Sequence, residues 1–338
     1  MNNKKKILFV AHMDSHIANF HLPYLRWFKD EGYETHVASN SLESTREIKY
    51  CDVKHQVDFK RSPFSLKNIK IYKNFKKIVK EHDYEIVHAH TPMGGLFTRL
   101  AFRKNKTSVF YTAHGFHFLK GGPKSSWFLF YPIEKYLSKY TNELLTINKE
   151  DYELASKKFS KKANISLING VGVNLDDYKT TSKSEQDILK NELKLNQNDF
   201  IMTYIGEHTK GKNQVYLINA MSKIVKVKPY VKLILVGYGK ELENHKKLIK
   251  NLNLEDNILV LGFRTDISNI LSITDLVVSS SLREGLAKAI LEALAAAKPL
   301  LVSNVRGSKD LVEESVNGLT FNPKNLDDFI VKFNKLEE

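Results

Sequence analysis

A chain of 338 residues is long enough to form two domains, each with its own hydrophobic core. Its single cysteine, Cys51, excludes a disulfide framework and a cysteine-based metal site, and it fits a reducing cytoplasm. The amino terminus passes from three lysines into an apolar run too short for a signal peptide, and no apolar segment is long enough to span a bilayer. We therefore expect a cytoplasmic protein, soluble or attached peripherally to the inner face of the membrane.

The positive charge is concentrated in the first half of the chain. Residues 1–170 hold 29 lysines and arginines against 16 acidic residues, a net charge of +13, whereas residues 171–338 hold 23 against 22, a net charge of +1. One explanation is a lysine-rich solvated surface. The other is attraction of the first half to anionic lipid or to nucleic acid.

The densest basic run covers residues 60–80 and carries apolar residues between its lysines. Ile71, Phe75 and Ile78 fall on one face at helical spacing. Such a helix could lie on a membrane surface, or it could bury the apolar stripe in a domain core while the lysines extend to solvent. The sequence leaves both interpretations open.

The first half alternates strand-length apolar runs with helical patterns. The expected strands are 7–11, 35–39, 85–89, 108–113, 144–148 and 165–169, and the expected helices are 23–31, the basic run, 94–103, 125–140 and one from 149. Repeated strand–helix order predicts a parallel, doubly wound sheet.

A polar loop at 169–174, followed by a charged stretch at 176–199, is the best domain boundary. A second series of strands follows at 200–205, 232–236, 257–261, 276–279, 300–303 and 319–321. We therefore predict two similar α/β domains, 1–170 and 171–338, with ligands bound at strand carboxyl ends in a cleft between the domains.

The stretch from Asp275 to Asn304 predicts one strand–turn–helix–strand unit. The free N–H groups at the helix start favour an anion. Glu284 sits in the turn and Glu292 about two turns into the helix. At about 100° per residue, eight steps leave them only about 80° apart in projection. Carboxylates beside a phosphate site are suited to accept hydrogen bonds from sugar or ribose hydroxyls, so the predicted ligand is a nucleotide-sugar.

Two further strand-end turns in the second half offer backbone groups. Leu235–Gly239 has two glycines without the third of a dinucleotide fingerprint, and Leu261–Asp266 could present backbone atoms to a base.

Two other turns carry candidate side chains. Tyr204–Asn213 is rich in glycine and lysine and is suited to a diphosphate, with Lys212 and Lys210 as the cations. In the first half, Thr112–His117 places His114 at a strand end beside a glycine.

Together these motifs resemble a known family. Glu284-x7-Glu292, with Arg306-Gly307 and Asn317-Gly318-Leu319, looks like the carboxyl-terminal signature of family 4 retaining glycosyltransferases. The segments 12–23, 90–95 and 112–118 are similar to those of bacterial capsule and exopolysaccharide transferases of the CapM and EpsD type. The resemblance covers nearly the whole chain and implies the GT-B fold, in which two Rossmann-like doubly wound parallel-sheet domains face an interdomain cleft.

The resemblance also implies roles for individual residues. Glu292 would bind the ribose, Glu284 the donor sugar, Lys212 the leaving diphosphate, and His114 the transferred sugar near its reacting carbon; His114 and Glu284 are the catalytic candidates. A loop at Ser15 to Asn19 would close over the phosphates. The complete set of expected substrate-binding residues is Ser15, His16, Gly206, Lys210, Lys212, Gly237, Phe263, Arg264, Gly285, Leu286, Ala287, Lys288 and Glu292.

Three departures from the family pattern stand out. Glu207 occupies a position where many members have arginine, and the front loop lacks the family's paired glycines. The chain ends at Glu338, whereas relatives usually continue for a few helices. We expect either a truncated form or weaker interdomain closure.

The implied reaction is transfer of a sugar, with retention of anomeric configuration, from a UDP-sugar to a polyprenyl diphosphate-linked saccharide during capsule or exopolysaccharide assembly. Its implied partners are the donor, the lipid-linked acceptor and an anionic membrane surface. A GT-B UDP-sugar 2-epimerase is the enzymatic alternative. A nucleic-acid binding protein is the non-enzymatic one, but it leaves both glutamates unexplained, so we expect no nucleic-acid partner.

The sequence predicts no catalytic metal and no cofactor beyond the nucleotide-sugar co-substrate. No Asp-x-Asp motif follows a strand, and the histidines form no spaced ligand set with the carboxylates.

Overall fold

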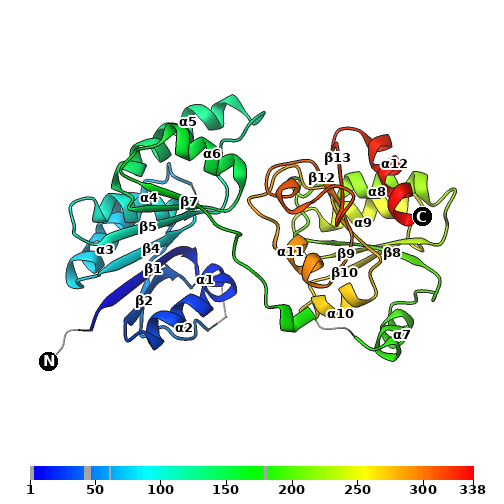
Figure 1. Ribbon diagram of the computed structural model, residues 1–338, viewed down its shortest axis with the longest axis horizontal. Coiled ribbons are helices and arrows are strands. Elements are labelled where there is room, and N and C mark those ends of the chain that lie inside the picture. Colours follow the sequence, from blue (N-terminus) through cyan, green and yellow to red (C-terminus); the bar gives the residue numbers. More distant parts are fainter. Residues whose placement is uncertain (1–3, 42–46, 61, 179–180) are drawn as a thin grey trace. The chain divides into compact units, whose positions relative to one another are not determined.

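The computed structural model describes residues 4–41, 47–60, 62–178 and 181–338, and it divides into two compact units, Met1–Val171 and Gly172–Glu338 (Figure 1). The sequence places the domain boundary after Gly170, in the same loop. Each unit is a parallel sheet with helices packed on both faces, as the alternating strand–helix order predicts.

In its described residues, the first unit holds a seven-stranded sheet in the order β3-β2-β1-β4-β5-β6-β7. The strands are β1 (Lys6–Met13), β2 (Glu34–Asn40), β3 (Val53–Gln56), β4 (Ile86–His90), β5 (Ser108–Ala113), β6 (Glu143–Thr146) and β7 (Asn164–Leu167). The helices are α1 (Asp14–Phe20), α2 (Leu22–Asp30), α3 (Lys67–Glu81), α4 (Pro92–Phe102), α5 (Lys124–Leu137), the 3-10 turn η1 (Ser138–Tyr140) and α6 (Lys149–Lys158).

Strand β1 shows why helices cover both faces of this sheet. Successive side chains of a strand point to opposite faces. Leu8 and Val10 pack in the core that includes Phe75 of α3 and Phe97 of α4. Ile7, Phe9 and Ala11 point the other way and join a core with residues of α1 and α2. An uninterrupted apolar run is therefore buried on both sides.

The second unit repeats this architecture with a six-stranded sheet, in the order β10-β9-β8-β11-β12-β13, among its described residues. The strands are β8 (Phe200–Ile205), β9 (Val231–Val236), β10 (Ile258–Gly262), β11 (Leu276–Ser279), β12 (Leu300–Ser303) and β13 (Gly318–Phe321). The helices are η2 (Leu175–Tyr178), α7 (Lys183–Glu192), α8 (Gln214–Ile224), α9 (Leu242–Asn251), α10 (Ile267–Ser272), α11 (Lys288–Ala295), η3 (Lys309–Leu311) and α12 (Leu326–Glu337).

Both sheets reverse their strand order once, and this fixes where a ligand is expected. The reversal lies between β1 and β4 in the first unit and between β8 and β11 in the second. In open α/β sheets, ligands bind outside the carboxyl ends of the strands at such a switch point. The turns after these four strands are therefore the places to look for functional residues.

The expected loop at Ser15 to Asn19 is wrong, because these residues form most of helix α1. Asp14 supplies a negative charge in the first turn, where the helix dipole favours it. Its buried carboxylate also accepts a hydrogen bond from Ser39 Oγ at 2.6 Å and pairs with Lys54 Nζ at 2.9 Å. These contacts anchor the start of a helix directly after β1.

The basic run proves to be a core helix. In α3, Phe75 is fully buried and Ile71 and Ile78 pack against the same core, so the apolar stripe faces the protein interior. Arg61, in the same run, lies outside the described residues. The exposed apolar side chains instead surround the start of the helix: Phe64 is 71%, Leu66 85% and Ile69 61% exposed.

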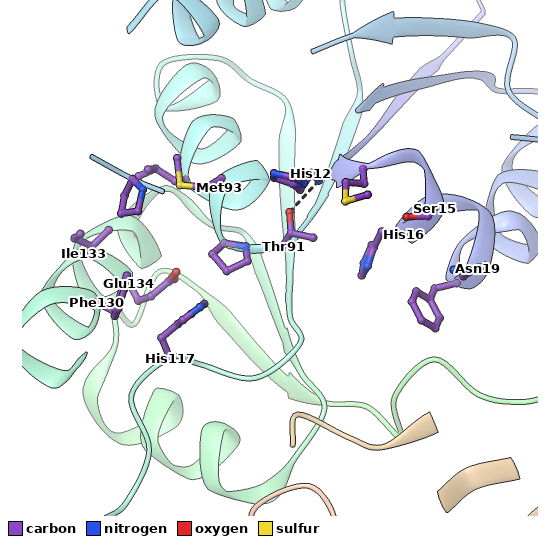
Figure 2. A pocket seen from close by; sticks show the side chains of 15 residues that line it. His12, Ser15, His16, Asn19, Thr91, Met93, His117, Phe130, Ile133 and Glu134 are labelled. Carbon is purple, nitrogen blue, oxygen red and sulfur yellow. Dashed lines mark hydrogen bonds between the residues drawn. The ribbon is translucent and has the colours of Figure 1, made fainter. Parts of the chain in front are cut away.

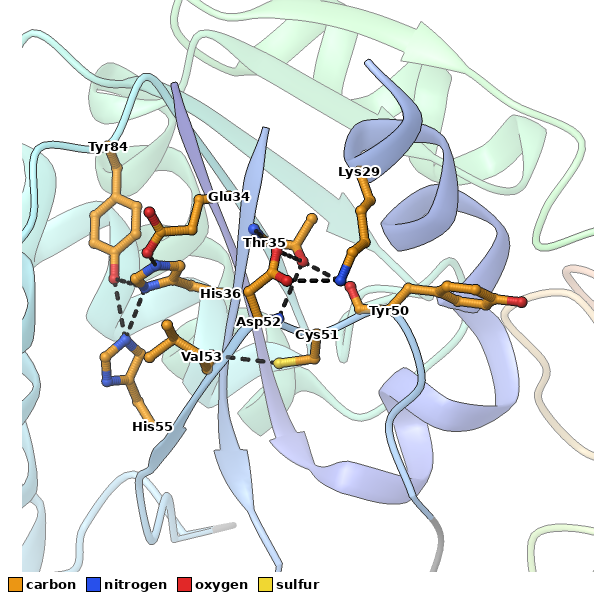
Figure 3. Close-up of polar contacts among 10 residues, drawn as sticks. All are labelled: Lys29, Glu34, Thr35, His36, Tyr50, Cys51, Asp52, Val53, His55 and Tyr84. Carbon is orange, nitrogen blue, oxygen red and sulfur yellow. Dashed lines mark hydrogen bonds and ion pairs between the residues drawn. The ribbon is translucent and has the colours of Figure 1, made fainter. Parts of the chain in front are cut away.

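Besides α1, helix α7 and strand β3 are absent from the sequence-based expectation. Helix α7 lies within the charged stretch assigned to the domain boundary, and Ser182 and Glu185 form a capping box at its start. Strand β3 pairs with β2, and Figure 3 shows polar contacts around this edge, among them Lys29 Nζ to Asp52 Oδ1 at 2.6 Å. Among the described residues, no helix is both long enough and apolar enough to cross a bilayer.

Candidate functional site

In the second unit, hydrogen bonds join the two turns at the switch point. The N–H of Leu282 donates to the carbonyl of Gly211 at 2.8 Å, and Ser280 Oγ donates to the carbonyl of Asn213 at 2.9 Å. These bonds bring the β8–α8 turn beside the β11–α11 turn. As a result, Lys212 Nζ lies 2.5 Å from Glu284 Oε1. Two residues that the sequence assigns to one ligand are thus in direct contact.

Glu284 lies in the turn before the helix, as the sequence predicts. Helix α11 begins only at Lys288, and residues 280–287 form an irregular turn, so the projection of about 80° between the two glutamates is wrong. Arg306 Nε donates to the Glu284 carbonyl at 3.2 Å. A Cβ on Gly307 would lie only 2.3 Å from the carbonyl oxygen of Gly285. Packing against the loop after β12 therefore fixes this turn.

Glu292 lies in α11 with its carboxylate almost fully buried. Lys288 Nζ is 2.7 Å from Glu292 Oε1, and the hydroxyl of Tyr178 faces the same carboxylate. Burial is the main cause of the raised pKa of Tyr178, and Glu292 adds to it, so the phenol stays protonated as a hydrogen-bond donor. The start of the helix lies between the two glutamates in sequence. There, Leu286 is half-buried, Ala287 is buried and Lys288 is exposed.

The expected glycines at the strand ends allow close backbone approach. The N–H of Gly206 donates to the carbonyl of Val236 at 2.9 Å. A Cβ on Gly237 would lie 2.2 Å from the carbonyl oxygen of Gly206, and one on Gly239 would lie 2.2 Å from that of His208. The turns after β8 and β9 can therefore pack together only without these side chains.

The remaining candidates in this unit lie nearer the surface. Phe263, after β10, is 55% exposed and its ring stacks with that of Tyr238, with centroids 6.3 Å apart. Arg264 forms a two-pronged ion pair with Asp266, at 2.8 and 2.6 Å, so its guanidinium is engaged within its own turn. Lys210 is exposed in the β8–α8 turn.

In the first unit, the switch point opens into a pocket of about 490 Å³. Figure 2 shows Ser15, His16 and Asn19 on one side of it and His117, Phe130 and Glu134 on the other. The N–H of His12, in β1, donates to Thr91 Oγ1 at 3.1 Å, which links the ends of β1 and β4. Most of the lining is apolar and comes from Met13, Phe20, Pro63, Met93, Leu96, Phe130 and Ile133.

A buried ion pair supports the polar side of the pocket, and sequence reasoning missed it. Arg99 is buried, and its guanidinium donates to Glu134 Oε2 at 2.7 Å and to the carbonyl of Gly95 at 2.9 Å. The guanidinium also lies 4.0 Å from the ring centroid of Tyr111. The two charged residues are 35 positions apart, on α4 and α5, so no local motif indicates the pair.

Thr91 has an unusual backbone for a residue with a branched side chain, with φ of 65° and ψ of 150°. Pro92 follows it as the first residue of α4. Such strained backbone is concentrated at functional sites. Its position between β4 and α4, on the pocket wall, agrees with a functional role for this pocket.

His114 follows β5 directly, as expected, and lies in a cluster of histidines that the sequence does not reveal. His16, His21, His90 and His114 each offer a ring nitrogen, and these nitrogens all lie within 4.8 Å of one another. From the sequence, we expect no ligand set that combines histidines with carboxylates. This cluster contains histidines alone. Spacings of 5, 69 and 24 residues are unreadable as a motif, because the fold brings three separate segments together.

Burial keeps these histidines neutral. It lowers the pKa of His114 to about 4 and, together with repulsion from His114, that of His16 to about 3. The pKa values of His21 and His90 are lowered in the same direction, chiefly by burial and further by neighbouring histidines.

Two family models match the chain, one in each unit. Residues 6–148 match the family described as glycosyl transferase 4-like, and residues 185–338 match the one described as glycosyl transferases group 1.

Two relatives match most of the chain. EpsD of Bacillus subtilis (strain 168), named as a glycosyltransferase, is 39% identical over 93% of this chain and 82% of its own. An Escherichia coli UDP-Gal:alpha-D-GlcNAc-diphosphoundecaprenol alpha-1,3-galactosyltransferase is 32% identical over 79% of this chain and 72% of its own. Both are transferases by name, which does not favour the epimerase alternative.

The fold matches solved structures over the whole chain. HepE of Anabaena, crystallised with UDP and glucose, is similar with a TM-score of 0.79 at 20% identity, covering 99% of this chain and 90% of that one. This likeness supports the two-domain GT-B fold. The chain therefore belongs to the family 4 glycosyltransferases of the GT-B fold and EpsD type, which are transferases of glycosyl groups.

Proposed function

We propose that this glycosyltransferase moves a sugar, with retention of anomeric configuration, from a UDP-sugar to a polyprenyl diphosphate-linked saccharide during capsule or exopolysaccharide assembly. One observation carries the proposal. The two switch points have complementary chemistry: paired charges and a helix start in the second unit, and a largely apolar pocket in the first. The charged turns of the second unit suit a charged, hydroxylated donor. The apolar pocket of the first unit suits an acceptor attached to a lipid.

The donor assignment rests on the contacts in the second unit. The start of α11, with the N–H groups of Gly285, Leu286, Ala287 and Lys288, favours the diphosphate. Glu292 and Glu284 accept hydrogen bonds from the ribose and from the donor sugar. Their present partners, Lys288 and Lys212, lie close enough to bind phosphate oxygens when the donor enters.

We assign the uracil base of the donor to a position beside the exposed rings of Tyr238 and Phe263. Tyr238 and Phe263 extend from the ends of β9 and β10, next to the glycine turns that include Gly206 and Gly237. A pyrimidine can stack on such rings, and the nearby backbone groups can read its edge. A uracil nucleotide also fits the UDP-galactose named for the Escherichia coli relative.

The acceptor assignment rests on the pocket of the first unit. Apolar side chains such as Phe20, Leu96 and Ile133 suit the hydrocarbon of a polyprenyl carrier, whereas Ser15, His16 and Asn19 can meet polar groups. The Escherichia coli relative acts, by its name, on a sugar linked to diphosphoundecaprenol. We infer the same class of acceptor here.

A membrane-bound acceptor requires a surface that meets the membrane. Pro63 lines the pocket, and the next residues carry the exposed apolar side chains of Phe64, Leu66 and Ile69. Lys67 and Lys70 are exposed beside them. Apolar side chains with flanking lysines are typical of surfaces that insert into an anionic interface. We define residues 63–70 as the α3 entry segment and assign it to the membrane.

The proposed reaction breaks the bond between the anomeric carbon and the diphosphate oxygen and forms one to the acceptor oxygen on the same face. A phosphate oxygen of the departing diphosphate accepts the acceptor proton. Lys212 and the amides at the start of α11 stabilise the charge that develops on the leaving group, which is where most of the rate acceleration arises. Glu284 orients the transferred sugar.

A panel of UDP- and GDP-sugars tested by thermal shift examines the donor assignment. A ligand that binds only the folded state raises the melting temperature according to its occupancy. We expect one UDP-sugar to stabilise the wild-type chain and Lys212→Ala to lose most of that shift. Stabilisation by GDP-sugars alone would overturn the UDP assignment, and an unchanged shift in Lys212→Ala would remove Lys212 from the site.

A further inference from the structure

Three of the clustered histidines carry a buried ring nitrogen that has no hydrogen-bond partner in the described part of the chain. These atoms are Nε2 of His16, Nε2 of His21 and Nε2 of His90. A buried polar atom without a partner is uncommon in native proteins and calls for an explanation. The unpartnered Nε2 atoms of His16 and His21 indicate a ligand that the imidazoles are arranged to hold. His90 meets His114 through its other ring nitrogen, Nδ1, so a ligand shared by that pair does not account for His90 Nε2.

We propose that His16, His21, His90 and His114 form a binding site for a divalent transition-metal ion of the zinc type. The four residues come from α1, from the junction of α1 and α2, from the end of β4 and from the residue after β5. The site thus lies at the switch point of the first unit. It is independent of the donor assignment in the second unit.

The spacing of the nitrogens fits tetrahedral coordination. Zinc–nitrogen bonds of 2.0–2.1 Å place two tetrahedral ligands about 3.3 Å apart. His90 Nδ1 and His114 Nε2 are 3.3 Å apart, and no ligand pair of the cluster exceeds 4.8 Å. The His21 and His90 rings stack with centroids 3.7 Å apart, so closing the site turns the His21 ring away from His90.

The charge state of the cluster favours a cation over an anion. A metal needs neutral imidazoles, and an ordinary histidine is mostly neutral above about pH 6.5. An anion such as a diphosphate would need protonated rings, which burial and mutual repulsion oppose. Four nitrogen ligands suit Zn²⁺ and its neighbours better than Mg²⁺ or Ca²⁺, which prefer oxygen.

The test is titration of the untagged, chelator-treated full-length chain with Co²⁺, whose visible spectrum distinguishes tetrahedral from octahedral coordination, followed by displacement with Zn²⁺. We expect one tetrahedral Co²⁺ per chain and a loss of affinity of at least about 100-fold in His16→Gln and in His90→Gln. His16 lies on a short helix and is only partly buried, so His16→Gln keeps the test valid if His90→Gln fails to fold.

A second histidine group in the same unit supplies the control. His36, His55 and His82 also lie within 4.8 Å of one another, and His36 Nε2 lies 2.8 Å from Glu34 Oε1 (Figure 3). We expect His55→Gln to keep the tetrahedral Co²⁺ signal. Loss of that signal in His55→Gln, its persistence in His16→Gln, or binding of inorganic pyrophosphate in place of Co²⁺ would each overturn the proposal. None of these readouts depends on transferase activity.

Discussion

At the scale of single residues, Glu284 and Glu292 are proposed to have separate tasks in binding the donor. Replacing Glu292 by Gln removes the charge of an acceptor while keeping its shape. Charge-assisted hydrogen bonds contribute about 1.5–3 kcal/mol, so we expect donor affinity, measured calorimetrically, to fall by roughly 10- to 150-fold. Glu243→Gln, on the exposed face of α9, is the matched control and should bind normally. Equal affinities for the two variants would contradict the ribose assignment.

The neutral histidines of the first unit predict acid sensitivity. The pKa of His114 is lowered to about 4 and that of His16 to about 3, whereas unfolded histidines titrate near 6.5. Between these values the unfolded chain binds more protons, so stability is complete above about pH 6.5 and is lost as the pH falls below it. The loss is roughly a kcal/mol per pH unit for each such histidine.

Urea unfolding at pH 7.5, 6.0 and 5.0, in the presence of a chelator, measures this dependence. We expect the midpoint to decrease at each step and the decrease to be smaller in His114→Gln, where one titrating group is missing. A midpoint that is independent of pH over this range would show that the histidines are not buried in the neutral form.

At the scale of elements, the turns after β8 and β9 depend on glycine. Gly237 has a φ of 138°, and its Cβ would lie 2.2 Å from the carbonyl oxygen of Gly206. We expect Gly237→Ala to destabilise the chain by about 1–3 kcal/mol, because a backbone atom must move. Gly211→Ala, whose Cβ would meet only Thr209 Oγ1 at 4.0 Å, is the control for a chemical denaturation experiment.

The elements also show how far sequence patterns reach. Apolar runs such as β1 and β8 are predictable because burial on both faces demands continuous hydrophobicity. Strand β3 is not, since Val53 is the only apolar residue among its four and lysine, histidine and glutamine follow it at the edge of the sheet. The start of helix α11 is also set by tertiary packing. Gly307 packs against the turn that contains Glu284, and the helix begins only at Lys288.

The site itself was predictable only where its residues are close in sequence. The glutamate spacing and the lysine-rich turn after β8 identify the donor residues as candidates, but their contact at 2.5 Å comes from adjacent strands. Arg99 and Glu134 are 35 residues apart, and the four clustered histidines span 98 residues from His16 to His114. No motif within one segment can indicate either feature. Tertiary proximity decides these features.

At the scale of the whole molecule, the net charge of +13 in residues 1–170 and the α3 entry segment predict binding to anionic vesicles. We expect the combined variant Phe64→Ser, Leu66→Ser and Ile69→Ser to lower binding to phosphatidylglycerol vesicles at least about 10-fold, because three apolar side chains no longer insert. Added salt should weaken the remaining binding.

The second unit supplies the matched control for this variant. Ile188 is 56% and Val331 55% exposed, and their replacement by Ser should leave vesicle binding unchanged. Equal binding by the α3 entry variant and the wild-type chain in a flotation assay would remove this segment from the membrane interface and leave only the diffuse charge as a cause of attraction.

The central claim is that a UDP-sugar and a lipid-linked saccharide react together on this chain. The most direct measurement is UDP release from the donor that binds, with and without a polyprenyl diphosphate-linked sugar, followed by determination of the anomeric configuration of the product. We predict that UDP release requires the acceptor and that the new glycosidic bond keeps the anomeric configuration of the donor. Release of UDP at the same rate without acceptor, or a product of inverted configuration, would contradict it.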